Sequence, residues 1–115
     1  MKKGVKVRDL RLGKGALAEK GKVVMVRYDG YLNRGEMFQE NFTYSFTLGG
    51  RKVIAGLEYG IEGMPVGGRR RIRVGPHLAY REAGVQNKIP SNAVLIFDVE
   101  LLEVREGAAA TGAVT

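Results

Sequence analysis

Hydrophobic and polar residues alternate along much of this chain, which is the pattern of half-buried β-strands. The clearest alternation covers 93–104, where Leu95, Phe97, Val99 and Leu101 share one face. Weaker or shorter runs predict further strands over 5–10, over 22–32, starting at 37, over 44–48 and over 69–74. Together these runs predict an antiparallel sheet of about five strands.

The segment 53–64 has helical periodicity instead. Its apolar residues fall within an arc of roughly 100° on a helical wheel: Val53, Ile54, Leu57, Ile61 and Met64. Gly56 and Gly60, at the margin of that arc, predict that the helix backbone lies close against the sheet. Gly63 and Pro65 end the helix. The pattern therefore predicts an α+β fold in which a strongly curled sheet wraps around one short helix.

Two connections carry turn signals that matter for the topology. After the strand at 22–32, the hairpin signal Asp29-Gly30 competes with a second turn at 33–36, and periodicity does not choose between them. The connection 75–92 is longer than ordinary loops, and such loops are usually functional or mobile.

The length of 115 residues predicts one domain, over 1–104, followed by a disordered tail over 105–115. No apolar run follows the basic N-terminus, so we expect neither a signal peptide nor a transmembrane helix. Cysteine is absent, which excludes disulfides and thiolate nucleophiles. A cytoplasmic protein is the expectation.

The formal charge of +7 favours a phosphate-rich partner in principle. Only 69–73 is densely basic, however, and there Arg69, Arg71 and Arg73 share one strand face while Ile72 lies on the other. No aromatic residue is interleaved with these arginines. This pattern favours a solvated strand face over a nucleic-acid site.

Polar catalytic constellations are not apparent in the sequence. His77 is the single histidine and has no positioned Ser or Cys partner, so we expect it to be exposed on a loop. The acidic residues lack the spacing of a metal site, and we expect neither a metal nor a cofactor.

Aromatic residues form the more informative set. They are spread over several predicted strands and the long loop: Tyr28, Phe38, Tyr44, Phe46, Tyr80 and Phe97. One interpretation is that they are simply core, which we prefer for Phe46. The other is an apolar pocket with the helix at Leu57 as its floor.

An ordered set of segments resembles the FKBP family of peptidyl-prolyl cis-trans isomerases. The segments, spread over nearly all of 5–104, are VRYDGYL at 26–32, FTLG at 46–49, VIAGLE at 53–58, GMPVG at 63–67, AY at 79–80, IP at 89–90 and LIFDVEL at 95–101. The resemblance implies the FKBP half-barrel, which agrees with the fold predicted from periodicity. It also implies catalysis of X-Pro bond rotation in protein substrates, assistance to protein folding, and binding of the macrolide inhibitors of the family.

The same resemblance assigns residues to a proline pocket, in a protein that we expect to be a monomer. It implies catalytic positions at Tyr28, Phe38, Tyr80 and Phe97. It implies substrate-binding positions at Gln39, Tyr44, Val53, Ile54, Leu57 and Ile89. The backbone N–H of Ile54 and the hydroxyl of Tyr80 should hold substrate carbonyls.

Four features depart from the family pattern. Gln39 replaces the usual Asp, Leu57 replaces the commoner Trp, Arg81 replaces Gly, and the 39–44 segment is short and lacks the usual arginine. These departures predict slow turnover and weak binding of the macrolide inhibitors. The alternative hypothesis is a module of FKBP shape that holds proline segments with weak or no turnover; a nucleic-acid or ribosome-associated protein is a third hypothesis, which rests on charge alone.

Overall fold

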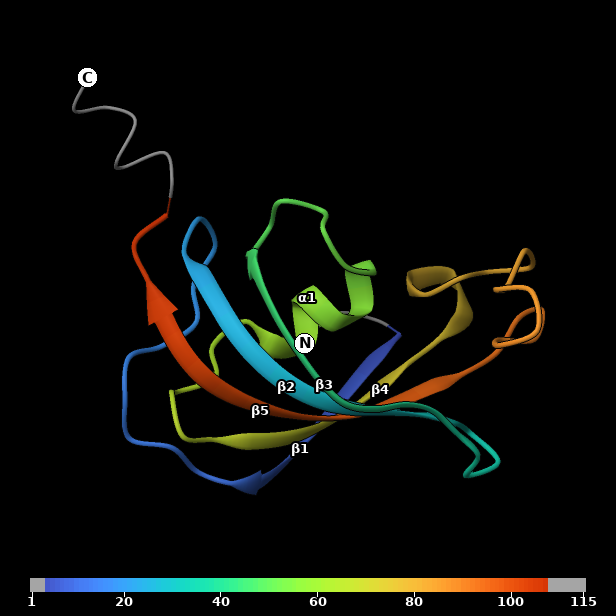
Figure 1. Cartoon of the computed structure of the whole chain (residues 1–115), viewed down its shortest axis with the longest axis horizontal. Coiled ribbons are helices and arrows are strands. Elements are labelled where there is room, and N and C mark those ends of the chain that lie inside the picture. Colours follow the sequence, from blue (N-terminus) through green and yellow to red (C-terminus); the bar gives the residue numbers. More distant parts are fainter. Residues whose placement is uncertain (1–3, 108–115) are drawn as a thin grey trace.

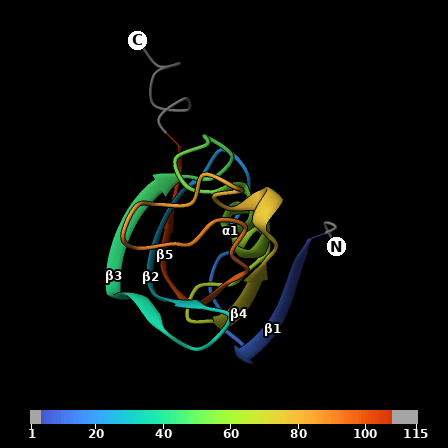
Figure 2. The same cartoon turned by 90° about the vertical axis from the view of Figure 1, so that its right-hand side faces the viewer.

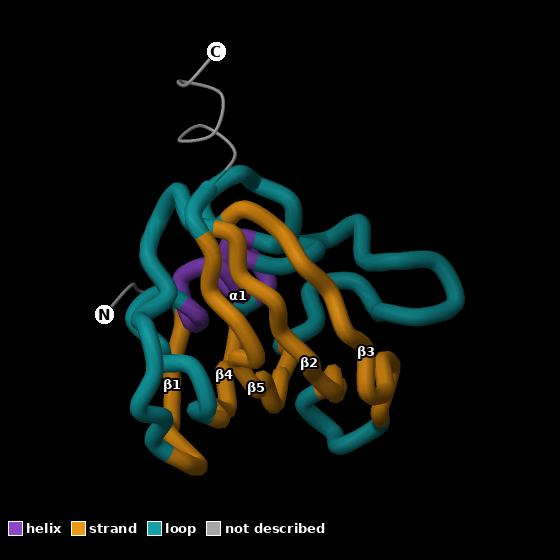
Figure 3. The backbone as a smooth tube through the Cα atoms, turned by 60° about the vertical axis from the view of Figure 1, so that its left-hand side comes forward, coloured by secondary structure: helices purple, strands orange, loops and turns teal. Residues whose placement is uncertain are grey.

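The computed structural model describes residues 4–107, which form five strands and one α-helix (Figure 1). In chain order the elements are β1 (Val5–Arg11), β2 (Val23–Leu32), β3 (Met37–Thr47), α1 (Ala55–Ile61), β4 (Arg69–Val74), the 3-10 helix η1 (Pro76–Leu78) and β5 (Leu95–Arg105). The strands pair antiparallel in the order β1-β4-β5-β2-β3 (Figure 3). The sheet curls around α1, so the predicted α+β half-barrel is confirmed.

Two glycines allow α1 to lie directly on β4. A Cβ added to Gly56 would overlap Val74 Cγ1, and one added to Gly60 would lie 2.5 Å from Ile72 Cγ2. Any side chain at these positions would push the helix away from the sheet. The predicted close approach of helix and sheet is therefore confirmed, and both glycines are buried.

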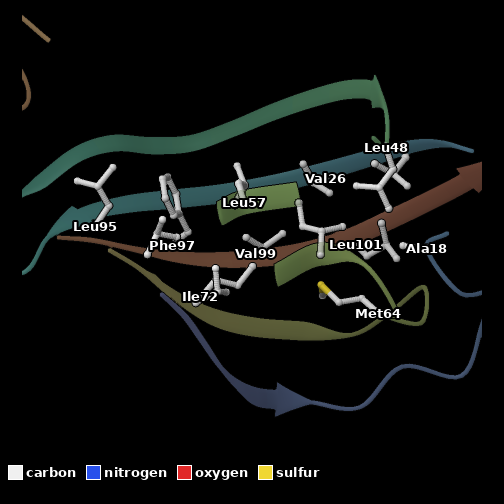
Figure 4. Packing of buried hydrophobic residues seen from close by; sticks show 14 of the residues in the cluster. Ala18, Val26, Leu48, Leu57, Met64, Ile72, Leu95, Phe97, Val99 and Leu101 are labelled. Atoms are coloured by element: carbon white, nitrogen blue, oxygen red, sulfur yellow. The ribbon is translucent and has the colours of Figure 1, made fainter. Parts of the chain in front are cut away.

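The hydrophobic core fills the space between α1 and the concave face of the sheet (Figure 4). The alternating residues of β5 all point into it, as predicted: Leu95, Phe97, Val99 and Leu101 are at most 3% exposed. Leu57 and Met64 cover them from the helix side, and Phe46 is also core, as expected.

The helix is shorter than the predicted 53–64. Ile54 has φ −58° and ψ 147°, which is extended backbone, so the first helical residue is Ala55. In the turn before it, the Glu58 carboxylate oxygen Oε2 accepts the backbone N–H groups of Gly49 at 2.9 Å and Arg51 at 3.2 Å. The helix ends at Ile61, before the predicted residue 64. Gly63, the glycine predicted to end it, follows with φ +89°.

The two strands predicted from 37 and over 44–48 are one continuous strand, β3. The prediction missed the polar stretch between them because that stretch lies on the open edge of the sheet, where polar residues face solvent. Extra residues on β3 shift its register opposite Tyr28 and Gly30, and Asn41 at φ +46° donates its N–H to Asp29 Oδ1. Of the two turns that the sequence offered, the hairpin between β2 and β3 uses the one at 33–36, where the Leu32 N–H donates to the Glu36 carbonyl at 2.7 Å.

At the end of the domain, β5 runs over Leu95–Arg105 and not over 93–104. Arg105, assigned by the sequence to a disordered tail, is thus the last strand residue, and most of that predicted tail, 108–115, lies outside the described residues. No helix within 4–107 is long and apolar enough to cross a bilayer.

Ion pairs on both faces of β4 engage part of the basic cluster, Arg71 on the solvent-facing side and Arg70 on the side of α1. Arg71 donates two hydrogen bonds to Asp98, at 2.8 and 3.0 Å. Arg70 is 14% exposed at its side chain and donates to Asp9 Oδ1 and to the Gly60 carbonyl. The two arginines therefore brace the sheet and the end of α1, and Arg71 lies on the solvent-facing side, as predicted.

Candidate active site

A cavity of about 280 Å³ opens at one end of the half-barrel. Figure 2 looks at this end, where the orange segment after η1 crosses in front of α1 and β3 forms one side. The lining residues are Tyr28, Phe38, Gln39, Phe42, Tyr44, Lys52, Val53, Ile54, Leu57, Tyr80, Val85, Lys88, Ile89 and Phe97. All ten residues assigned to the pocket from the sequence are among them, although they come from β2, β3, β5, α1 and two loops.

The inner part of the cavity is aromatic. Phe97, 3% exposed, makes edge-to-face contacts with Tyr28 and Phe38, with ring centroids 5.6 and 5.8 Å apart. Gly30 makes room for this arrangement, because an added Cβ would lie 2.6 Å from Phe38 Cζ. Leu57, where the family usually has Trp, is 2% exposed. These residues form an apolar floor that excludes water.

Two tyrosine hydroxyls bring polar chemistry into the apolar lining. Burial raises the pKa of Tyr28 to about 12, with smaller contributions from the Tyr80 and Tyr44 hydroxyls. Burial also raises the pKa of Tyr80. Within the described residues neither the Tyr28 nor the Tyr80 hydroxyl makes a hydrogen bond. Both are therefore neutral groups with free hydrogen-bonding capacity at physiological pH.

A backbone donor lies at the helix entrance. The Ile54 carbonyl accepts the N–H groups of Leu57 and Glu58, whereas the Ile54 N–H has no partner in the described part of the chain. The helix start leaves this N–H unpaired because no side chain caps it. It provides an oriented donor at the cavity wall.

The long connection holds Tyr80 through backbone hydrogen bonds. Arg81 N–H donates to Pro76 O at 3.0 Å, and Asn92 N–H donates to the Arg81 carbonyl at 2.8 Å. Arg81 adopts φ +54° there, a region that favours glycine, which is the residue usual in the family at this position. The segment is therefore ordered, and Tyr80 is placed at the cavity mouth, 38% exposed.

Four lining residues were missed from the sequence: Phe42, Lys52, Val85 and Lys88. Phe42 contacts Tyr28 edge-to-face and stacks on Tyr44 at 5.8 Å. Phe42 could have been found from the sequence, because residues 42, 44 and 46 alternate along one face of the same strand. The other three lie on loops, where periodicity gives no information.

Gln39 has a partner that the sequence did not indicate. Lys88 Nζ donates to Gln39 Oε1 at 3.3 Å, across the cavity mouth between β3 and the long loop. A cation of the long loop thus contacts the residue that departs from the family pattern.

Other chemistry is not assembled at the cavity. His77 lies on η1 and is exposed, as expected. No group of three or more His, Cys, Asp or Glu within 4–107 is placed to hold a metal ion. What the cavity offers is a mostly apolar volume open at one end, with a few neutral donors and two exposed lysines in its lining.

Comparisons with known proteins agree with this geometry. A family profile described as FKBP-type peptidyl-prolyl cis-trans isomerase matches residues 14–102. The chain is 48% identical over 106 residues to FK506-binding protein 4 of Aspergillus fumigatus and 42% identical over 106 residues to the 46 kDa FK506-binding nuclear protein of Spodoptera frugiperda. These matches cover 90% and 89% of this chain but 22% and 26% of the relatives.

A solved structure shares the fold. The crystal structure of FkpA from Escherichia coli superimposes with a TM-score of 0.78 at 36% identity, over 91% of this chain and 53% of that one. The chain thus spans about a quarter or less of these two curated relatives and about half of FkpA. The profile, the relatives and the fold all identify the chain as a member of the FKBP-type peptidyl-prolyl cis-trans isomerase family.

Proposed function

We propose that the chain catalyses cis-trans rotation of X-Pro bonds in protein substrates. The observation that carries the proposal is that one largely apolar cavity is lined by all ten positions assigned by family resemblance, beside an unpaired Ile54 N–H. The family membership supports it. Folding assistance and binding of FK506-type macrolides are part of the same proposal.

The reaction needs no nucleophile or cofactor. Its barrier of about 18–20 kcal/mol is the loss of amide resonance when the C–N bond twists. A twisted amide is less dipolar than a planar one, so an apolar cavity stabilises it relative to the ground state. Each ~1.4 kcal/mol of that preference accelerates rotation about tenfold.

The roles follow from where each residue lies. The proline ring occupies the floor formed by Tyr28, Phe38, Leu57 and Phe97. The Ile54 N–H and the Tyr80 hydroxyl donate to substrate carbonyls. The remaining positions, Gln39, Tyr44, Val53 and Ile89, form the walls that exclude water.

NMR exchange spectroscopy on a short X-Pro peptide tests the proposal directly, because it needs no coupling protease. Catalysed exchange at substoichiometric protein supports an isomerase. Binding of the peptide without accelerated exchange would support the alternative, a module that holds proline segments. If the peptide neither binds nor shows accelerated exchange, both ideas lose their support.

Tyr80→Phe is expected to leave folding intact and to lower affinity for the peptide modestly. Only one hydroxyl hydrogen bond is lost, which corresponds to about 0.5–1.5 kcal/mol. Peptide titration followed by NMR measures the change, and circular dichroism controls for folding. Unchanged affinity and rate would show that the hydroxyl does not reach substrate.

Gln39→Asp is expected to raise kcat/KM by up to about tenfold, because a carboxylate offers stronger, charge-assisted hydrogen bonds than an amide. Lys88, which already contacts Gln39, is available to pair with the new charge. Exchange rates of both proteins on one peptide decide the matter. Equal or slower exchange in the variant would mean that the apolar cavity, and not residue 39, limits the rate.

The cytoplasmic location, the monomeric state and the absence of nucleic-acid binding stay predictions. The ion pairs of Arg70 and Arg71 support the last of these, because they already satisfy two of the clustered arginines. A salt-dependent pull-down of nucleic acid tests it.

A further inference from the structure

The charged residues in the cavity lining are all basic. Lys52 and Lys88 both line it and are exposed, and none of the described lining residues is acidic. Glu40 and Glu82 are chain neighbours of the lining, but both are exposed and lie outside it. The mouth of an apolar site is therefore marked by two ammonium groups.

Three further carboxylates, Asp29, Glu58 and Asp98, are chain neighbours of the lining, and each accepts hydrogen bonds from residues outside it. Glu58, next to Leu57 in α1, accepts the N–H groups of Gly49 and Arg51 through Oε2. Two further cations, Arg51 and Arg81, precede Lys52 and follow Tyr80 respectively, and both are exposed. The lining itself thus carries only positive formal charge, and Arg51 and Arg81 beside it add to that charge.

The two lysines lie at different parts of the mouth. Lys88 is on the long connection, where its Nζ contacts Gln39 Oε1. Lys52 lies two residues before Ile54, whose unpaired N–H is the proposed donor to a substrate carbonyl. Neighbouring residues of a bound peptide are 3.8 Å apart at Cα, so side chains flanking the proline lie within reach of these ammonium groups.

We propose that this site selects proline segments that carry an anionic side chain, a carboxylate or a phosphate, within two residues of the proline. The proposal rests on the isomerase function above and names its substrate class. Exposed charges at the edge of a binding site act mainly by raising the association rate and by penalising partners of like charge. They do so most strongly at low salt.

The test uses NMR exchange on four peptides that differ in the residue before proline: Glu, phosphoserine, Gln and Lys. Each catalysed rate is referred to the same peptide without protein. We expect kcat/KM for the Glu peptide to exceed that for the Gln peptide by about threefold to fivefold and the Lys peptide to be slowest. The difference should shrink at 0.5 M salt. If the site prefers both the Glu and the phosphoserine peptides, its substrate class is anionic segments in general. If it prefers only the phosphoserine peptide, its substrate class is phosphorylated segments.

Charge-reversal variants identify the groups responsible. Lys52→Glu and Lys88→Glu should each reduce the preference, and the double variant should reverse it. Lys14→Glu is the matched control, because Lys14 is exposed, lines no part of the cavity and changes the net charge equally. The control should keep the preference.

Equal rates on the Glu and Gln peptides would overturn the inference, as would a preference that survives in the double variant. Failure of the isomerase function itself looks different, since no peptide would then show catalysed exchange. In that case titration of the Glu and Gln peptides still decides the charge preference, and equal affinities would refute it.

Discussion

Phe97→Ala is expected to lower the free energy of unfolding by about 3–5 kcal/mol and to reduce kcat/KM at least about tenfold. The ring is 3% exposed and lies on β5, in the middle of the sheet, where it contacts both Tyr28 and Phe38. Its removal leaves a hole at the floor of the cavity that admits water. Chemical denaturation and peptide exchange measure the two effects separately.

Phe97→Leu keeps the experiment decisive if the alanine variant does not fold. Leucine retains part of the buried apolar volume, so the loss of stability should be smaller while the aromatic contacts disappear. A folded Phe97→Leu protein with full turnover would remove the Phe97 ring from the proposed site.

Gly56→Ala is expected to destabilise the protein by about 1–3 kcal/mol, although alanine is the better helix former by about 1 kcal/mol. The added methyl would overlap Val74 Cγ1, and Val74 is fully buried in β4, so the helix must move. Ile54 and Leu57 move with α1, and kcat/KM should fall as well. Thermal unfolding and peptide exchange report the two changes.

The compensating variant Val74→Ala tests the cause, because it removes the methyl groups that the new Cβ would meet. In a double-mutant cycle, Gly56→Ala together with Val74→Ala should be less destabilised than the sum of the two single variants. Simple additivity would show that close packing of α1 on β4 is not the reason for glycine at this position.

The fold was predictable where one face of an element is buried. The apolar alternation of β5 and the glycines of α1 both reflect packing against the core, and both predictions are confirmed. The prediction broke down at the start of the helix. Apolar Val53 and Ile54 fit the helical pattern, but Ile54 is extended and follows a turn whose Gly49 and Arg51 N–H groups bond to Glu58.

The site could be predicted only in part, and for a similar reason. The resemblance supplied every aromatic residue of the cavity except Phe42, and all of those that it supplied line the cavity. The contact between Lys88 and Gln39 joins residues 49 positions apart through a loop without periodicity. The room that Gly30 leaves for Phe38 depends on a shift in strand register, which no local pattern reveals.

The position of β5 in the sheet also affects how the chain folds during its synthesis. β5 is made after the other four strands, yet it lies between β4 and β2. Until it emerges, the chain has only two separate ladders, β1 with β4 and β2 with β3, whose apolar faces and inner edges are uncovered. Pairing over such long sequence separations is slow. During synthesis the two ladders are therefore exposed to non-native pairing and aggregation until β5 joins them.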